Sequence, residues 1–144
     1  MQRNNGTSEE VHTFGWYNRK FIRDVRAKGG TPVIMAPTPY NTWRDGEFVY
    51  RPGNMSQWGR QIADQEGVLF LNHGQIIAAR YAKLGEEAVR PFFPADWLHT
   101  STFGAIVNAE MFVAGVKALG IKPIVDGLSD KGKAIDAYEP PAGS

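Results

Sequence analysis

The sequence contains no cysteine among its 144 residues. This absence excludes disulfide frameworks, zinc sites with cysteine ligands, iron–sulfur centres and cysteine nucleophiles. It assigns no compartment, because many secreted proteins also lack cysteine. An excess of one charge is absent too, since 16 Lys and Arg residues against 15 Asp and Glu residues give a formal net charge of +1. Nucleic acid and anionic membranes are therefore not expected partners, and small polar ligands or other proteins fit this balance better.

Long hydrophobic runs are also missing. A membrane-spanning helix needs about 20 apolar residues, and every apolar run here is interrupted by glycine, proline or charge. Residues 1–10 lack the apolar segment of a secretory signal peptide. If Met1 is the start of the gene product, no signal peptide is expected, and the cellular location stays unassigned. A content of 42% hydrophobic and 22% charged residues is typical of one globular domain.

Hydrophobic periodicity and turn residues divide the chain into expected elements. Residues 1–10 form a polar lead-in, and a helix over 11–28 carries Phe14, Tyr17, Phe21 and Val25 at steps of three or four residues. The further elements are a strand at 31–36, a loop at 37–53, a helix from Asn54 or Ser56 to Gly67, a strand at 68–71, a helix at about 75–84, an aromatic-rich loop at 85–103, a helix at 104–119 and a tail at 120–144. The tail is expected to fray from Glu139 onward.

The two short apolar segments, at 31–36 and 68–71, predict strands that are buried on both faces, as in a parallel sheet. The order strand, helix, strand is a βαβ unit and predicts an α/β fold. Four helices flank these two strands, whereas a doubly wound sheet usually holds about five or six strands. The chain is therefore expected to be a piece of a larger α/β domain, or to complete its sheet through another chain, such as a second copy that pairs at the exposed strand edges.

Three histidines are the side chains that titrate near neutral pH without special surroundings. His12, beside Glu9 and Glu10 at a helix start, is expected to be a surface or capping residue. His73 follows Asn72 at the carboxyl end of the second expected strand. Open α/β sheets bind ligands at that end, so His73 is either a ligand contact or a packed loop residue.

The third histidine, His99, lies three residues after Asp96. One helical turn would bring both side chains to the same side, where the carboxylate can accept the Nδ1 proton and leave Nε2 free as a base. The alternative is that Asp96 caps a helix and His99 is solvated. Ser101 is too near in sequence to aim its hydroxyl at this imidazole and is a poor nucleophile candidate. Metal-ligand spacings and glycine-rich phosphate loops are missing, so no metal and no cofactor is expected.

Aromatic residues gather in the two longer loops. The first loop contains Trp43, and the second contains Trp97 shortly before His99. Aromatic faces stack on sugar rings, although most aromatic side chains simply bury area. Trp43 and Trp97 are therefore candidate carbohydrate contacts, with packing as the alternative.

Several ordered blocks of the sequence resemble one known family, the SGNH (GDSL-type) hydrolases, and rhamnogalacturonan acetylesterases in particular. The blocks are Asp96-x-x-His99-Thr100-Ser101-x-x-Gly104-Ala105, Gly30-Thr31-Pro32-Val33-Ile34 through Pro37-Thr38-Pro39-Tyr40-Asn41-Thr42-Trp43, and Tyr81-x-x-Leu84-Gly85, with Phe48-Val49, Trp58, Ile62-Ala63 and Gly67-Val68 in the same order. The resemblance covers about residues 11–119. Leu98 departs from it, because the family usually has threonine before the histidine.

The resemblance implies a three-layer α/β/α, flavodoxin-like fold with a parallel sheet of about five strands. It implies an enzyme whose serine attacks an acetyl ester on a pectic polysaccharide, with His99 as the base and Asp96 as the residue that orients it. The family's serine, glycine and asparagine blocks, which supply the nucleophile and the oxyanion donors, lie upstream of the matched region. The chain is therefore expected to be the C-terminal portion of such an enzyme.

Two functional hypotheses follow. In the first, the substrate is an acetylated polysaccharide or oligosaccharide, Trp43, Trp97 and His73 are candidate substrate contacts, and the isolated chain is inactive or nearly so. In the alternative, the chain is a non-catalytic module that binds carbohydrate or a partner protein through its aromatic loops. Members of the resembled family are often secreted or periplasmic, and this leaves the location of the present chain open.

Overall fold

The structure is a computed structural model that describes residues 10–140. Expectations for residues 1–9 of the lead-in and for residues 141–144 of the tail lie outside this range. The elements, in chain order, are α1 (Phe14–Ala27), β1 (Val33–Met35), β2 (Trp43–Arg44), β3 (Glu47–Phe48), α2 (Gly53–Glu66), β4 (Leu69–Leu71), α3 (His73–Leu84), α4 (Glu86–Val89), the 3-10 helix η1 (Arg90–Phe92), α5 (Thr102–Ala118), α6 (Lys122–Val125) and α7 (Asp130–Lys133).

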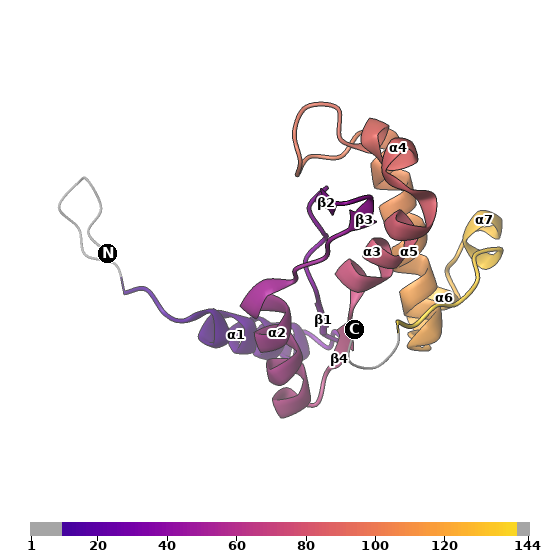
Figure 1. The fold of residues 1–144 in the computed structure, drawn as a ribbon. Coiled ribbons are helices and arrows are strands. Elements are labelled where there is room, and N and C mark those ends of the chain that lie inside the picture. Colours follow the sequence, from indigo (N-terminus) through magenta and orange to yellow (C-terminus); the bar gives the residue numbers. More distant parts are fainter. Residues whose placement is uncertain (1–9, 141–144) are drawn as a thin grey trace.

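Strands β1 and β4 form a two-stranded parallel sheet, in which Val33 pairs with Leu69 and Met35 pairs with Leu71. Parallel strands need a crossover connection, and α2 lies in that connection. In Figure 1 the two strands lie between the α1–α2 pair and the α3–α5 pair. The fold is therefore α/β with helices on both faces of a small sheet, as predicted.

Alternation of side chains along the strands decides which helix covers which face. Ile34 and Phe70 lie against Gly59 of α2. On the other face, Leu71 packs with Ile76 of α3. The βαβ unit thus has one face for α2 and the opposite face for α3 and α5.

The prediction that both strands are buried on both faces is wrong. Met35 is 48% exposed and Leu69 is 40% exposed. Among residues 10–140 each strand has a single hydrogen-bonded neighbour, so each has one edge unpaired within that range, and the flanking helices leave part of the adjoining side chains uncovered.

Most helix termini have local causes. The hydroxyl of Thr13 accepts a bond of 3.2 Å from the Trp16 amide at the start of α1. Gly67 adopts the left-handed conformation, with φ 61°, that ends α2. The expected start of α2 at Asn54 or Ser56 is wrong by a few residues, because α2 follows directly on Pro52, whose fixed φ already suits a helical start.

The segments expected to be loops contain short elements. Between 37 and 53, β2 and β3 form an antiparallel hairpin, whose turn residues Asp45 and Gly46 have φ of 51° and 80°. An Asp-Gly pair is the usual sequence of such a turn, and the flanking strands are too short to show alternation. Between 85 and 103, α4 and η1 precede the loop proper.

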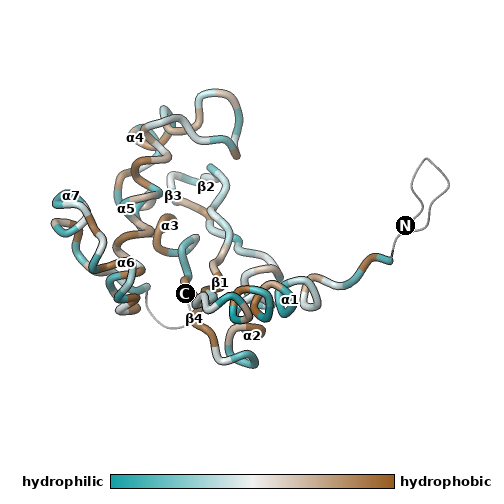
Figure 2. Tube along the Cα trace, turned by 180° about the vertical axis from the view of Figure 1, so that it is seen from behind, coloured by the Kyte–Doolittle hydropathy of each residue, from teal (hydrophilic) through white to brown (hydrophobic). Residues whose placement is uncertain are grey.

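The hydrophobic core has two clusters on either side of α3. One joins Leu71, Ile76, Val116 and Ile121. The other contains Ile77, Tyr81, Val89 and Phe93, with partly buried Trp43 and Phe48 against it. Helix α5 is hydrophobic along most of its length, as Figure 2 shows, which suits a helix that contacts both clusters. No helix within residues 10–140 has the length and apolar composition to cross a membrane.

Helix α1 is amphipathic as predicted, but its apolar stripe is not buried. Phe14, Tyr17 and Phe21 are exposed, and Ile22 is the buried residue of the helix. Polar contacts attach α1 to the end of α2, since Arg19 Nε lies 3.1 Å from Glu66 Oε1. The stripe is only partly covered, since the Phe14 ring lies near that of Trp58 with centroids 6.1 Å apart and Val25 is half-buried.

The tail packs back against the domain before the point at which it is predicted to fray. Residues up to 140 return along α5, where the Tyr138 amide donates to the Ala114 carbonyl at 3.1 Å. Lys117 Nζ donates to the Lys133 carbonyl at 2.9 Å. The segment beyond residue 119 is therefore packed against the α/β unit at least as far as Tyr138.

Replacing Gly74 by alanine should destabilise the fold. An added Cβ would lie 2.2 Å from the Pro37 carbonyl oxygen and 2.1 Å from the Tyr50 hydroxyl. Overpacking of this kind costs about 1–3 kcal/mol or more, which exceeds the ~1 kcal/mol that alanine gains over glycine in a helix. Gly127→Ala is the control, because its added Cβ meets contacts no closer than 3.6 Å. Urea denaturation followed by circular dichroism should show a lower midpoint for Gly74→Ala alone, and equal midpoints would contradict this packing.

Candidate catalytic histidine site

The expected contact between Asp96 and His99 is present. Asp96 Oδ2 lies 2.7 Å from His99 Nδ1. The contact does not arise from a helical turn, because residues 94–98 form bends. Instead, Asp96 Oδ1 accepts backbone N–H bonds from Leu98 at 2.8 Å and from His99 at 2.7 Å. The pair thus lies in the predicted loop, and a side-chain turn of the Asx type, rather than a helical turn, brings the two side chains together.

Hydrogen bonding keeps the Asp96 carboxyl ionised. Its pKa is lowered from 3.8 to about 2 by the His99 amide, by the His99 imidazole and by the Leu98 amide, in that order. A carboxylate can only accept hydrogen bonds, so the proton of a neutral His99 ring lies on Nδ1. Nε2 then has a free lone pair, and the His99 side chain is 75% exposed.

Backbone hydrogen bonds attach the loop that carries this pair to the rest of the domain. The Asn41 amide donates to the Trp97 carbonyl at 2.9 Å. The Ser101 amide donates to the Phe92 carbonyl at 2.7 Å. Asn41 lies in the loop that follows the carboxyl end of β1. The sheet therefore positions the segment that contains His99 by way of this loop.

Trp97 is a surface residue next to the pair. It is 58% exposed, and its ring meets that of Tyr40 edge-on with centroids 4.6 Å apart. Tyr40 is also exposed. Sequence reasoning selected Trp97 but not Tyr40, whose only signal is its position in the proline-rich loop after β1. The two form an exposed aromatic pair beside His99.

Trp43 lies in the second core cluster rather than on an open surface. It packs edge-on against Phe48 with centroids 5.1 Å apart, and its indole N–H donates to Asn41 Oδ1 at 2.8 Å. This bond holds the side chain of Asn41, and the backbone N–H of the same residue donates to the Trp97 carbonyl. The structure therefore favours packing for Trp43, and it reveals Asn41 as a link that sequence reasoning missed.

His73 is the first residue of α3 and is buried, with 5% exposure. Its Nε2 lies 2.9 Å from the Asn108 carbonyl oxygen of α5, and its Nδ1 has no partner in the described segment. Burial lowers the pKa of His73, which favours the neutral ring. His73 joins α3 to α5 and is not hydrogen-bonded to Asp96 or His99.

Ser101 has a structural role at the start of α5. Its hydroxyl accepts from the Gly104 amide at 3.4 Å and donates to the Pro91 carbonyl at 3.2 Å. No serine among residues 10–140 is hydrogen-bonded to the His99 ring. In the same range, no group of three or more histidine or carboxylate side chains has a geometry suited to a metal ion.

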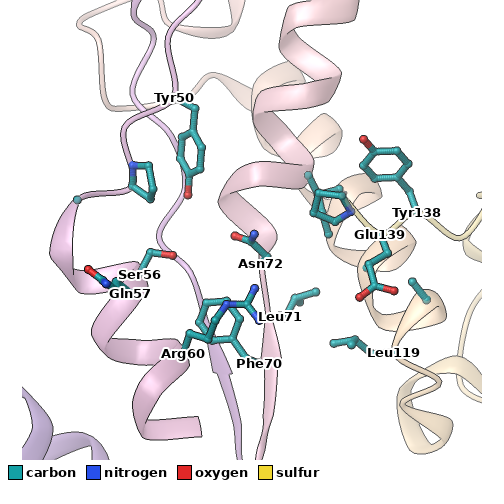
Figure 3. Close-up of a pocket in the computed structure, with 16 residues that line it drawn as sticks. Tyr50, Ser56, Gln57, Arg60, Phe70, Leu71, Asn72, Leu119, Tyr138 and Glu139 are labelled. Atoms are coloured by element: carbon teal, nitrogen blue, oxygen red, sulfur yellow. The ribbon is translucent and has the colours of Figure 1, made fainter. Parts of the chain in front are cut away.

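A separate cavity of about 1030 Å³ lies beside β4, between α2 and the C-terminal segment (Figure 3). Tyr50, Ser56, Arg60 and Asn72 contribute polar groups to its wall. The Tyr50 hydroxyl is buried without a partner, and burial raises its pKa to about 12. Asp96 and His99 do not line this cavity. Sequence reasoning missed it because its wall comes from several distant segments.

The depressed pKa of Asp96 should depend partly on His99. Its carboxyl ¹³C signal should titrate with a midpoint of about 2. His99→Ala should raise this midpoint while leaving it below the ordinary 3.8, because two backbone amides still donate to Oδ1. At pH values above the ordinary pKa of 3.8, the contacts of the charged carboxylate stabilise the loop. This stabilisation is lost as the pH falls towards 2. His12→Ala is the control, and a midpoint that His99→Ala leaves unchanged would show that the pair does not interact in solution.

No family model matches the chain. Over 117 residues, or 81% of the chain, it is 32% identical to the rhamnogalacturonan acetylesterase of Emericella nidulans, and the match covers 48% of that protein. Over 126 residues, or 84% of the chain, it is 25% identical to a probable rhamnogalacturonan acetylesterase of Bacillus subtilis, with 58% of that protein covered. The chain spans about half the length of the curated relatives it matches.

The fold is similar to a solved structure as well. The crystal structure of protein YxiM of Bacillus subtilis matches 76% of this chain with a TM-score of 0.65. The sequences are 22% identical, and 32% of YxiM is covered, so this likeness concerns the fold alone. The sequence matches and the α/β architecture together place the chain in the SGNH (GDSL-type) hydrolase superfamily, as a relative of the rhamnogalacturonan acetylesterases.

Proposed function

We propose that this chain is the C-terminal portion of a carbohydrate acetylesterase, in which His99 is the catalytic base and Asp96 holds its ring. The observation that carries the proposal is the 2.7 Å contact between Nδ1 and Oδ2, with the imidazole 75% exposed. A histidine tied at Nδ1 and open at Nε2 suits general base catalysis. The similarity to rhamnogalacturonan acetylesterases supports an ester of a pectic saccharide as the substrate.

In this proposal His99 transfers one proton in each of two half-reactions. Its Nε2 accepts the hydroxyl proton of a serine as the serine oxygen bonds to the acetyl carbon, and donates that proton to the sugar oxygen as the ester bond breaks. Water then gives a proton to Nε2 as its oxygen bonds to the acetyl carbon, and that proton passes to the serine oxygen as acetate leaves. Asp96 stays charged throughout and stabilises the imidazolium. The serine and the oxyanion donors come from outside residues 10–140, since no serine there is bonded to His99.

The exposed pair of Trp97 and Tyr40 is the proposed sugar contact. Both rings are accessible beside the histidine loop, and aromatic faces pack well against sugar rings. Trp43 and His73, by contrast, contribute to substrate binding only through packing, because one lies in a core cluster and the other is buried against α5.

A fused hydrolase tests the catalytic role. This chain would replace the matched 117 residues of the Emericella nidulans enzyme, and acetate release from acetylated rhamnogalacturonan would be measured. His99→Ala and Asp96→Asn should each lower kcat by roughly 10⁴-fold or more, as the loss of such residues does in serine hydrolases, while His12→Ala leaves it unchanged. The unfused chain should release acetate at the background rate, and turnover that His99→Ala abolishes there would show that the nucleophile lies within this chain.

The same aromatic pair also supports the second candidate function, a non-catalytic carbohydrate-binding module. Titration of the unfused chain with pectic oligosaccharides, followed by tryptophan fluorescence, distinguishes the two. If the chain is such a module, Trp97→Ala should abolish saturable binding, whereas Trp43→Phe and His99→Ala should retain it. Under the esterase proposal, the unfused chain should bind these oligosaccharides weakly. A fused hydrolase that is active and loses kcat with His99→Ala would rule out a non-catalytic role.

A further inference from the structure

The cavity beside β4 receives polar side chains from separate segments of the chain. Its volume of about 1030 Å³ is at the upper end of the range for small-molecule sites, about 300–1,000 Å³. The polar residues come from the loop after β3, from α2 and from the residue after β4, and they are Tyr50, Ser56, Arg60 and Asn72. In Figure 3 the hydroxyls of Tyr50 and Ser56 and the side-chain amide of Asn72 point towards the same space. The fold therefore brings them together around one ligand-sized volume.

These polar side chains have no hydrogen-bond partner within residues 10–140. The Tyr50 hydroxyl is buried without one. Asn72 is the N-cap residue of α3, yet its side chain makes no capping bond. Ser56 is only 9% exposed, and its side chain forms no hydrogen bond in the described range. Polar groups removed from bulk water are costly when unpaired, so a polar ligand would supply the bonds that this wall lacks.

Arg60 gives one side of the cavity a positive charge. It lies four residues after Ser56, so both side chains are on the same face of α2. The Arg60 guanidinium carbon lies 4.4 Å from the centre of the Phe70 ring, and this cation–π contact holds the charge against β4. No ion pair involves Arg60 within the described range. A guanidinium binds a carboxylate through two parallel N–H bonds, so this side of the cavity suits a carboxylate.

The far side of the cavity has the opposite charge. Glu139 lies across the cavity from Arg60 in Figure 3, and apolar side chains of Leu71 and Leu119 lie between them. A carboxylate such as that of Glu139 accepts hydrogen bonds and repels a second carboxylate. The complementary ligand is therefore an anion at one end, carries hydroxyl donors at the other, and has an apolar face between them. A sugar acid has this arrangement, because one face of its ring consists of C–H groups.

The cavity reaches the end of the sheet at which the segment with His99 is attached. Asn72 directly follows the carboxyl end of β4, and the loop after β1 contacts Trp97. Because the strands are parallel, both connections leave the sheet at the same end. Open α/β sheets bind their ligands at this end. The position of the cavity therefore fits a ligand site as well as its chemistry does.

We propose that the cavity beside β4 binds a uronic acid residue of a saccharide, whose carboxylate pairs with Arg60 and whose hydroxyls bond to Tyr50, Ser56 and Asn72. The choice of a sugar acid rests on the proposed function, because pectic saccharides contain galacturonic acid. Inorganic phosphate would also pair with Arg60, but it has no apolar face to place against the leucines. The site needs neither an acetyl group nor His99, so it is separate from the catalytic one.

The experiment titrates the ¹⁵N-labelled unfused chain with sodium galacturonate and follows the binding by NMR. The side-chain signals of Arg60 and Asn72 should shift saturably, and those of His99 should not. Galactose has a hydroxymethyl group in place of the carboxylate and should bind roughly tenfold or more weakly, since it loses a hydrogen-bonded charge. Arg60→Gln should weaken galacturonate binding by a similar factor. Arg23→Gln is the matched control, because Arg23 is exposed on α1 and does not line the cavity.

A second variant tests the cavity without changing its charge. Ser56→Ala should weaken the binding of both sugars by about two- to tenfold, as the loss of a neutral hydrogen bond does. Circular dichroism checks that each variant folds. Binding that Arg60→Gln weakens and Trp97→Ala leaves unchanged supports the cavity site and separates it from the exposed aromatic pair.

Several outcomes would overturn this site. These are absence of galacturonate binding, equal affinity for galacturonate and galactose, and equal effects of Arg60→Gln and Arg23→Gln. Inorganic phosphate that binds as tightly as galacturonate also overturns it, since the cavity then accepts any anion. The titration contains no ester, so binding that depends on Arg60 supports the cavity site even if the fused hydrolase is inactive. An active fused hydrolase together with absent galacturonate binding rejects the cavity site alone.

Discussion

The pairing of β1 with β4 is the constraint on which the rest of the structure depends. The two strands are three residues long and parallel, so the segments that follow them emerge at the same end of the sheet. The bond from the Ala36 amide to the Leu71 carbonyl is formed at this end of the sheet. Beyond it, β4 leads into α3, and β1 leads into the loop that contacts Trp97. The position of His99 therefore depends on a short sheet several elements away, through the contact between Asn41 and Trp97.

The electrostatics of the candidate site follow from hydrogen bonding rather than from burial. Asp96 accepts two backbone amides and one imidazole while it remains at the surface. Exposed ionic contacts contribute little stability because water screens them, so the contact matters mainly for the orientation of the ring. Cover from further protein or from substrate would strengthen the same interaction, because charges interact more strongly away from water.

The unpaired edge of β1 and the candidate site belong to neighbouring parts of the structure. A strand added in parallel along β1 would end at the same side as β1, next to the loop that leads to Trp97 and His99. Ligands of open α/β sheets bind at the carboxyl ends of the strands. The loop that carries His99 is therefore attached to the end of the sheet at which such ligands bind.

Local sequence determined much of this protein. The steps of three and four residues predicted helices within a few residues of α1, α2, α3 and α5, and the short apolar runs predicted β1 and β4. The spacing of Asp96 and His99 predicted their contact by way of a helical turn, and the structure makes the same contact through an Asx-type turn. Helix periodicity and short spacings are properties of neighbouring residues, so the sequence contains them directly. The β2–β3 hairpin was missed although Asp45-Gly46 marked its turn, since strands of two residues show no alternation.

Only the tertiary structure decided which of these residues are available for function. His73 and Trp43 lie in interior contacts with α5 and the second core cluster, while Tyr40 meets Trp97 across 57 positions of the sequence. Burial of a side chain depends on residues that are distant in the sequence, so the residues next to it in the chain do not predict whether it is buried. For the same reason the apolar stripe of α1 reads as a core face in the sequence, and its exposure is visible only once α2 and β1 are placed beside it.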